Sequence, residues 1–181
     1  MRAVLLGPPG AGKGTQANLL HERLNVPHIS TGDLLRTAVR EGSDLGVQAK
    51  GFMDRGELVP DELVVDLIGE RLHRDATSGF LLDGFPRNVS QGETLEGLLA
   101  ENEVALDHVL SLEVPVDELV DRMMGRGRAD DNEDTIRSRL AVYTKETEPL
   151  CSFYRERGLL REIDGTGTPQ EISGRILSRV Q

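Results

Sequence analysis

The sequence is poor in the residues that build disulfide frameworks, cysteine-bound zinc sites and membrane spans. Cys151 is its only cysteine, which excludes an internal disulfide and a cysteine-cluster zinc site. No apolar run approaches the roughly 18 residues of a membrane-spanning helix. The apolar stretch at residues 3–6 is also too short for the core of a signal peptide. We therefore expect a cytoplasmic protein with no membrane partner.

Positive charge is scarce as well. The 181 residues include 21 Lys and Arg against 31 Asp and Glu, a formal net charge of −10. Nucleic acids and anionic membranes bind to positive fields, so neither is an expected partner. Lysine is rare among the basic residues, occurring only at Lys13, Lys50 and Lys145. The four histidines are not spaced like metal ligands, and we assign no chemistry to them or to Cys151.

Short apolar runs alternate with amphipathic helical patterns. The runs predict strands at residues 4–6, 26–29, 80–82, 109–114 and 159–163. Helices are predicted from about residue 13 and at residues 32–41, 45–55, 60–74, 89–101, 115–124, 132–157 and 169–180. Thr168, Pro169 and Glu171 supply capping signals for the last helix. The pattern predicts one α/β domain over residues 1–181, with a five-stranded parallel sheet covered on both faces and ligands at the carboxyl ends of its strands.

The clearest motif follows the first predicted strand. Residues 7–15 read Gly-Pro-Pro-Gly-Ala-Gly-Lys-Gly-Thr, the spacing of a P-loop with Gly14 where Ser or Thr is usual. Its glycines let consecutive N–H groups face one anion, and the helix that begins near Lys13 adds its positive dipole end. An ordinary glycine-rich turn is the alternative, but the strand, the helix and the rare lysine favour phosphate binding. The expected nucleotide contacts are Gly10, Ala11, Gly12, Lys13, Gly14 and Thr15.

Three further motifs occur downstream. They are Ser30-Thr31-Gly32-Asp33-Leu34-Leu35-Arg36, Asp83-Gly84-Phe85-Pro86-Arg87 and Gly125-Arg126-Gly127-Arg128-Ala129-Asp130-Asp131. With the P-loop they span most of the chain, and the combination resembles the adenylate kinases of the short-lid type. The resemblance implies reversible phosphoryl transfer from MgATP to AMP, giving two ADP. It also implies a core of residues 1–29, 60–125 and 134–181, a helical nucleoside-monophosphate-binding segment at 30–59 and a short lid at 126–133.

The arginines suit this chemistry. The acceptor phosphate of AMP is already ionised near neutral pH, so it needs charge compensation rather than a general base. Arginine holds phosphate oxygens in pairs and stabilises charge on the transferred group. We therefore assign Lys13 to the donor phosphates and Arg36 and Arg87 to the acceptor phosphate. By resemblance, Arg122 and Arg126 contact ATP. Three arginines close over the transferred phosphoryl group: Arg126, Arg128 and Arg139. Of these, Arg128 and Arg139 also contact AMP.

Helical periodicity distinguishes Arg139 from Arg137. The apolar stripe that contains Ile136, Leu140 and Tyr143 has its centre about 60° from Arg139 and about 100° from Arg137. Arg139 is therefore expected to border the core or a cleft. A lone arginine on a helix is more often a solvated surface charge, and this alternative stays open for Arg36 and Arg122 taken singly.

Choice of the base depends on few residues. By resemblance Gln91 lies against adenine, and its amide offers one donor and one acceptor in a plane, matching the N6 amine and the adjacent ring nitrogen. The related uridylate-cytidylate kinases tend to carry Asn in place of Gln91 and Ala in place of Thr31, so these residues favour AMP. For Met53, Leu58 and Val59, core packing is the alternative. The other expected AMP contacts are Glu57 through its backbone, Gly84, Phe85 and Pro86, and Gly167 is expected near the donor adenine.

Magnesium is expected to arrive on ATP. Because Gly14 lacks a hydroxyl, phosphates and waters should hold the ion, with Asp83 and Asp33 contacting the waters. The short connection after Arg126 has no inserted cysteine domain, so no zinc is expected. Nothing demands an oligomer, and a monomer that binds ATP, AMP and ADP is the expectation. Two alternatives remain, a uridylate-cytidylate kinase and a P-loop switch, although the Asn-Lys-x-Asp motif of a GTPase-like switch does not occur.

Overall fold

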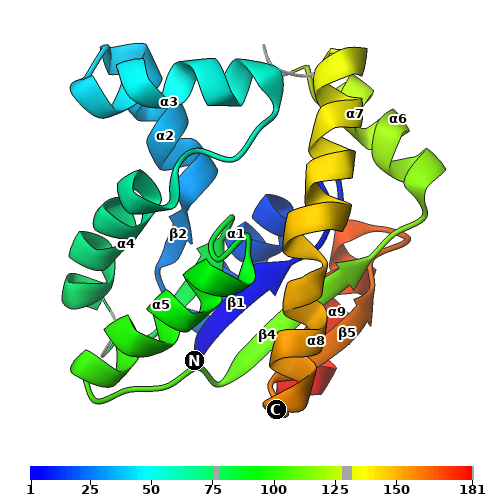
Figure 1. Cartoon of the computed structure of the whole chain (residues 1–181). Helices are drawn as coiled ribbons and strands as arrows, with labels where there is room; N and C mark the ends of the chain where they lie inside the picture. Colours follow the sequence, from blue (N-terminus) through cyan, green and yellow to red (C-terminus); the bar gives the residue numbers. More distant parts are fainter. Residues whose placement is uncertain (76–77, 128–131, 181) are drawn as a thin grey trace.

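Strands and helices alternate along the chain (Figure 1). The computed structural model describes residues 1–75, 78–127 and 132–180. The elements are β1 (Arg2–Leu6), α1 (Lys13–Leu24), β2 (His28–Ser30), α2 (Thr31–Glu41), α3 (Asp44–Arg55), α4 (Asp61–Asp75), β3 (Phe80–Asp83), α5 (Val89–Glu101), β4 (His108–Glu113), α6 (Val116–Arg126), α7 (Glu133–Val142), the π-helix η1 (Tyr143–Thr147), α8 (Pro149–Glu156), β5 (Leu160–Asp164) and α9 (Pro169–Val180). All the predicted elements are confirmed to within two residues at each end, except the long helix expected at 132–157.

The strands of the described chain form one parallel sheet of five, in the order β2-β3-β1-β4-β5. The central strand β1 pairs on one side with β3, where Val4 lies opposite Leu82, and on the other with β4, where Val4 lies opposite Val109. Because every strand runs the same way, all their carboxyl ends meet at one edge. The loops that follow β1, β2 and β3 are thereby brought together.

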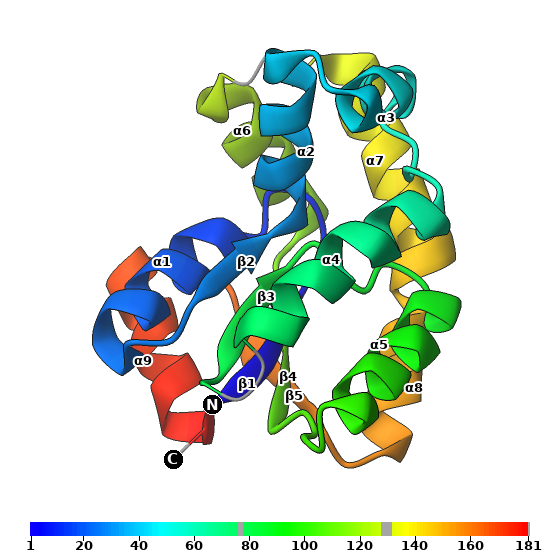
Figure 2. The same cartoon turned by 90° about the vertical axis from the view of Figure 1, so that its left-hand side faces the viewer.

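Helices cover both faces of this sheet. Alternate residues of a strand point to opposite faces, so Val4 packs in a core cluster with α4, α5 and α8, and Leu5 packs in a second cluster with α1, α6 and α9. Figure 2 shows α1 and α9 on one side of the sheet and α4, α5 and α8 on the other. Leu81 and Leu82 are both 0% exposed, as expected for a strand buried on both faces. The predicted three-layer α/β fold is confirmed.

Residues 30–59 form a pair of helices beyond the carboxyl edge of the sheet (Figure 1). Ser30 caps α2 by accepting from the N–H of Asp33, and Ser43 caps α3 by accepting from the N–H of Gly46, both at 3.2 Å. The two helices pack closely at Gly46, where a Cβ would collide with the carbonyl oxygen of Ala38. The helical character expected of this segment is therefore observed.

The single helix predicted at residues 132–157 is wrong. The structure has α7, then the π-turn η1, then α8, which follow one another in one column (Figure 1). In the π-turn the N–H of Glu148 donates to the carbonyl of Tyr143, five residues back, at 2.9 Å. Pro149 begins α8 and has no N–H to continue the pattern. An apolar stripe of helical period does not reveal where such a turn is inserted.

The capping of α9 agrees with the sequence. The N–H of Thr168 donates to Glu171 Oε2 at 2.8 Å, and the N–H of Glu171 donates to Thr168 Oγ1 at 3.3 Å. This reciprocal pair satisfies two donors at the helix start. It also lowers the pKa of the Glu171 carboxyl, because the backbone and side chain of Thr168 both stabilise its charged form.

Tyr154 offers a test of the core. Its side chain is 0% exposed, and its hydroxyl has no hydrogen-bond partner within the described residues. We expect Tyr154→Phe to raise the free energy of unfolding by about 1 kcal/mol, because it removes an unpaired buried polar group. Leu150→Ala, in the same cluster, should instead lower it by about 2–5 kcal/mol. Urea unfolding measures both values, and a less stable Tyr154→Phe protein would contradict the expectation.

Candidate active site

A cavity of about 730 Å³ lies at the carboxyl edge of the sheet. This volume is typical of a site for a small organic ligand. The register of the sheet explains its composition, because Leu5, Ser30 and Asp83 lie side by side on adjacent strands. Nearly all the predicted site residues within the described chain line it: Gly10, Ala11, Gly12, Lys13, Gly14, Thr15, Thr31, Asp33, Arg36, Met53, Glu57, Leu58, Val59, Asp83, Gly84, Pro86, Arg87, Gln91, Arg122, Arg139 and Gly167.

A few predicted residues do not join this set. Phe85 is 0% exposed and packs in the core cluster below α4 and α5, so its side chain does not reach the cavity. Two residues after the end of β3, the side chain of Phe85 is taken up by apolar packing in this cluster. Arg128 lies outside the described residues together with Asp130 and Asp131, and so does the side chain of Arg126.

The P-loop is held tightly against the rest of the core. Gly7 and Gly10 have φ of +139° and +86°, and a Cβ on either would lie within 3 Å of the carbonyl of Leu112 or Leu119. The helix α1 then begins at Lys13, with no side-chain cap and no acidic residue in its first turn. The positive end of its dipole therefore faces the cavity with no acidic side chain from its own first turn, which suits a bound phosphate.

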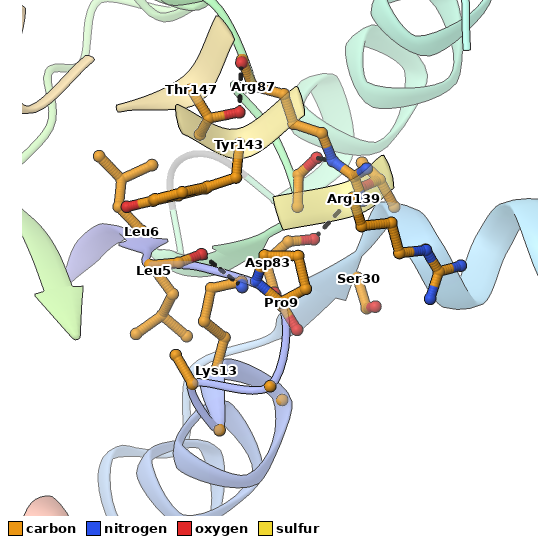
Figure 3. Close-up of a pocket in the computed structure, with 18 of the residues that line it drawn as sticks. Leu5, Leu6, Pro9, Lys13, Ser30, Asp83, Arg87, Arg139, Tyr143 and Thr147 are labelled. Carbon is orange, nitrogen blue, oxygen red and sulfur yellow. Dashed lines mark hydrogen bonds between the residues drawn. The ribbon is translucent and has the colours of Figure 1, made fainter. Parts of the chain in front are cut away.

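Lys13 bends back over this loop. Its Nζ donates to the carbonyls of Gly7 at 2.7 Å and Pro8 at 3.0 Å. Figure 3 shows Lys13 and Arg87 entering the cavity from opposite sides, with Asp83 between them. The cations of the P-loop and of the third strand's loop thus face a common space.

Asp83 ends β3 beside the P-loop. Its Oδ2 lies 3.7 Å from His28 Nε2. Burial alone would raise the pKa of Asp83, but the approach of His28 and the positive charges of Lys13 and Arg87 together bring it below its ordinary value. A Cβ on Gly14 would lie 3.3 Å from the same oxygen, so glycine at position 14 leaves room in front of the carboxylate. Asp83 is therefore a charged group with open space before it.

The backbone and side chain of Arg87 are fixed by three hydrogen bonds. Its Nε donates to the carbonyl of Gly84 at 2.9 Å, its N–H donates to Gln91 Oε1 at 2.7 Å, and its carbonyl accepts from Thr147 Oγ1 at 2.7 Å (Figure 3). Burial lowers the pKa of the guanidinium, the charge of Asp83 opposes this shift, and that of Arg36 adds to it. The group is oriented before any ligand binds.

The other arginines of the cavity come from separate elements. Arg36 on α2 pairs with Asp33 at 2.5 Å. Arg122 on α6 donates to Glu118 at 2.5 Å and to the carbonyl of Gly165 at 2.9 Å. These contacts show that neither is simply a solvated charge.

The periodicity argument on α7 is confirmed. Arg139 lines the cavity, and Figure 3 shows it on the same side as Arg87. The side chain of Arg137 is 75% exposed and pairs with Glu133 at 2.7 Å. Arg139 also packs near the end of α3, where a Cβ on Gly56 would lie 3.1 Å from its Cγ.

The apolar part of the cavity lies partly in the core. Val59 is 6% exposed and belongs to the core cluster, and Met53 packs against that cluster, yet both line the cavity together with Leu58. Val59 and Met53 thus pack with the core and also line the cavity, whereas contact of these residues with a ligand stays a prediction. Gln91, at 2% exposure, presents a polar group to the same cavity.

Sequence reasoning missed several lining residues. Tyr143 and Thr147 reach the cavity from η1, and no periodic signal predicts that turn. His28 was given no chemistry, although it lies in the second predicted strand, near the edge where ligands were expected. Glu118 is one turn from Arg122 on α6, so the spacing of an i, i+4 ion pair could have found it.

The described residues show neither a cluster of potential metal ligands nor a membrane-spanning helix. They contain no group of three or more His, Cys, Asp or Glu side chains placed to hold a metal ion. Within the same residues, no helix combines the length and the apolar character needed to cross a bilayer. Single carboxylates such as Asp83 nevertheless remain able to contact the waters of a cation that a phosphate ligand brings.

Comparison with known proteins gives a consistent result. The family model described as adenylate kinase matches residues 5–159. An adenylate kinase of Leptospira biflexa is 50% identical over 184 residues, which cover 99% of both chains. Adenylate kinase 1 of Synechocystis is 54% identical over 171 residues, 94% of this chain and 91% of the relative, and an adenylate kinase of Thermobifida fusca is 50% identical over 186 residues, 100% and 98% respectively. With matches of this extent, the chain belongs to the adenylate kinase family.

Proposed function

We propose that this protein transfers a phosphoryl group reversibly from MgATP to AMP, giving two ADP. The observation that carries the proposal is the gathering of Lys13, Arg36, Arg87, Arg122 and Arg139 around one cavity in a protein of net charge −10. Two polyanions can be held together only where such cations compensate their charge. The family of the chain supports the same reaction.

The P-loop side receives the donor. The N–H groups at the start of α1 bind the outer phosphates of ATP, and Lys13 exchanges its loop carbonyls for phosphate oxygens. Arg122 adds charge from α6, and the backbone at Gly167 borders the donor adenine. Arg126 completes this side from the proposed lid.

The opposite side receives the acceptor. Arg36 and Arg87 bind the phosphate of AMP, and Arg139, with Arg128, stabilises charge on the group in transit. Gln91 and Thr31 read the base, and the side chains of Met53, Leu58 and Val59 cover it. The preset Arg87 guanidinium supports this role, since less reorganisation is needed when phosphate arrives.

Two segments are proposed to move around a core of residues 1–29, 60–125 and 134–181. Residues 30–59, which line the cavity from α2 and α3, act as the monophosphate-binding segment, and residues 126–133 act as a short lid. Closure over the nucleotides excludes water and suppresses hydrolysis of ATP, the gating role for which adenylate kinases are a standard example. The described cavity is built by one chain, which supports a monomer, and its substrates are cytoplasmic metabolites.

Magnesium is part of the ATP substrate in this proposal. Asp83 holds waters of the ion, because its carboxylate is charged and the missing side chain of Gly14 leaves space in front of it. Asp33 is the second candidate for such a contact, although its carboxylate is engaged by Arg36.

A panel of acceptors tests the reaction. MgATP is incubated with AMP, CMP, UMP or GMP in turn, and ADP is followed by a coupled assay. We expect AMP to exceed the other acceptors by about 100-fold or more in kcat/KM, because the amide of Gln91 matches adenine. Faster turnover of CMP or UMP would identify a pyrimidine nucleotide kinase. Slow hydrolysis of ATP that ignores the acceptor would instead support a nucleotide switch.

Arg87 tests the acceptor side. Arg87→Ala should lower kcat/KM for AMP by about 10²- to 10⁴-fold, since a preset cation on the reacting phosphates is lost. Affinity for ATP, measured by equilibrium binding, should change little. Arg137→Ala, which removes an exposed arginine of α7, is the matched control and should keep wild-type kinetics. Near-normal turnover by Arg87→Ala would refute its assigned role.

Asp83 tests the magnesium contact. Asp83→Asn keeps the size of the side chain but loses its charge, so kcat should fall by about 10- to 100-fold and more Mg²⁺ should be needed for half-maximal rate. The exposed Asp66→Asn serves as control. A titration with Mg²⁺ at fixed ATP measures both effects, and an unchanged dependence on Mg²⁺ would reject the contact.

A further inference from the structure

The amide of Gln91 is hydrogen-bonded at both of its ends. Its Oε1 accepts from the backbone N–H of Arg87 at 2.7 Å, and its Nε2 donates to Asp61 Oδ1 at 2.6 Å. Asp61 lies 30 residues earlier in the chain, in the first turn of α4, and was not among the predicted site residues. Gln91 is 2% exposed, so water cannot readily replace either partner.

Each partner of the Gln91 amide can take only one role in a hydrogen bond, either donor or acceptor. A carboxylate accepts hydrogen bonds, and a backbone N–H donates one. If the amide of Gln91 turned over, its oxygen would face the carboxylate of Asp61 and its NH₂ would face the N–H of Arg87. Both contacts would then be repulsive, and two buried polar groups would lose their partners. The network therefore permits a single orientation of the amide.

The carboxylate of Asp61 is itself fixed. Asn88 Nδ2 donates to both of its oxygens at 3.1 Å. Asn88 Oδ1 accepts from the N–H of Gln91 at 2.8 Å and thereby caps α5. Asp61, Asn88 and Gln91 thus form a closed ring of contacts, which Gln91 joins through both its side chain and its backbone N–H, and Asp61 cannot turn away without breaking several of them.

These contacts leave one lone pair of Oε1 and one hydrogen of Nε2 unused, and Gln91 lines the cavity, so we expect a ligand there to bind them. A 6-aminopurine offers a donor at its amine and an acceptor at N1, which fits this pair. A 6-oxopurine offers an acceptor at O6 and a donor at N1, which fits only the reversed amide. The orientation of Gln91 thus decides which class of purine is accepted.

We propose that Asp61 is a positioning residue that sets base specificity, by holding the Gln91 amide in the orientation that accepts 6-aminopurine and rejects 6-oxopurine monophosphates. This inference rests on the proposed function, in which Gln91 reads the base of the acceptor nucleotide.

Two variants of Asp61 test it. Asp61→Asn and Asp61→Ser replace the one-way acceptor by a group that can accept or donate, so only the N–H of Arg87 still opposes the reversed amide and the cost of reversal falls. The matched control is Glu62→Gln, which removes a carboxylate from the same helical turn of α4 at an exposed position. For each protein, kcat/KM is measured with AMP and with IMP at saturating MgATP and pH 8, together with KM for ATP and the thermal unfolding midpoint.

We expect the ratio of kcat/KM for IMP to that for AMP to rise about tenfold or more in both variants of Asp61. The change should appear mainly as a higher KM for AMP and a measurable rate with IMP, while KM for ATP stays at the wild-type value. Glu62→Gln should keep the wild-type ratio. A merely structural role would lower both rates together and leave the ratio unchanged.

A ratio that stays at the wild-type value in both folded variants overturns the proposal. If one variant does not fold, the other decides, and the unfolding midpoints identify which proteins are folded. A wild-type protein that does not phosphorylate AMP refutes the proposed function itself. The activity of the wild-type protein with AMP thus tests the proposed function, and the ratios of the Asp61 variants test the role of Asp61.

Discussion

The structure depends on holding several cations around one cavity. Like charges at short range repel strongly where water is partly excluded. Four of these cations have oxygen partners within the protein: two loop carbonyls for Lys13, Asp33 for Arg36, Glu118 for Arg122 and the carbonyl of Gly84 for Arg87. Oxygen atoms of a phosphate can replace these partners in kind. The internal partners therefore offset part of the repulsion among the cations, and they are groups that phosphate oxygens could replace.

The parallel sheet converts distant motifs into one site. Leu5, Asp83 and Ser30 are far apart in the chain, but the register sets them at the same level on β1, β3 and β2. Each residue is followed closely by a segment that lines the cavity. The P-loop follows β1, the segment containing Arg87 follows β3, and the start of α2 follows β2. No side chain has to reach far, because the backbone has already brought the loops together.

The fold was largely predictable because its signals are local. Apolar runs, glycines with positive φ and the capping residues of α9 each act within a few neighbours, and the periodicity on α7 was enough to separate Arg139 from Arg137. The features that the sequence did not predict depend on contacts between distant residues or on a change in the helical hydrogen-bond pattern. The link between Asp61 and Gln91 spans 30 residues, and the π-turn that brings Tyr143 to the cavity follows no repeating pattern.

The same contrast explains Phe85. Its motif groups it with the residues that line the cavity, but whether an aromatic side chain points to the cavity or to the core depends on the turn after β3. Sequence alone places the residue in the right loop. Only the packing of α4 and α5 beneath that loop decides its direction.

The bonding of Arg87 has a consequence for ligand size. Its N–H holds the amide of Gln91 and its carbonyl is tied to Thr147, so the guanidinium and the amide belong to one stiff stretch of backbone. The distance between the Arg87 guanidinium and the Gln91 amide is therefore set by the backbone. In the proposed function, a nucleoside monophosphate contacts both groups at once only if its sugar spans that distance, so this stretch of backbone would select ligands by length as well as by base.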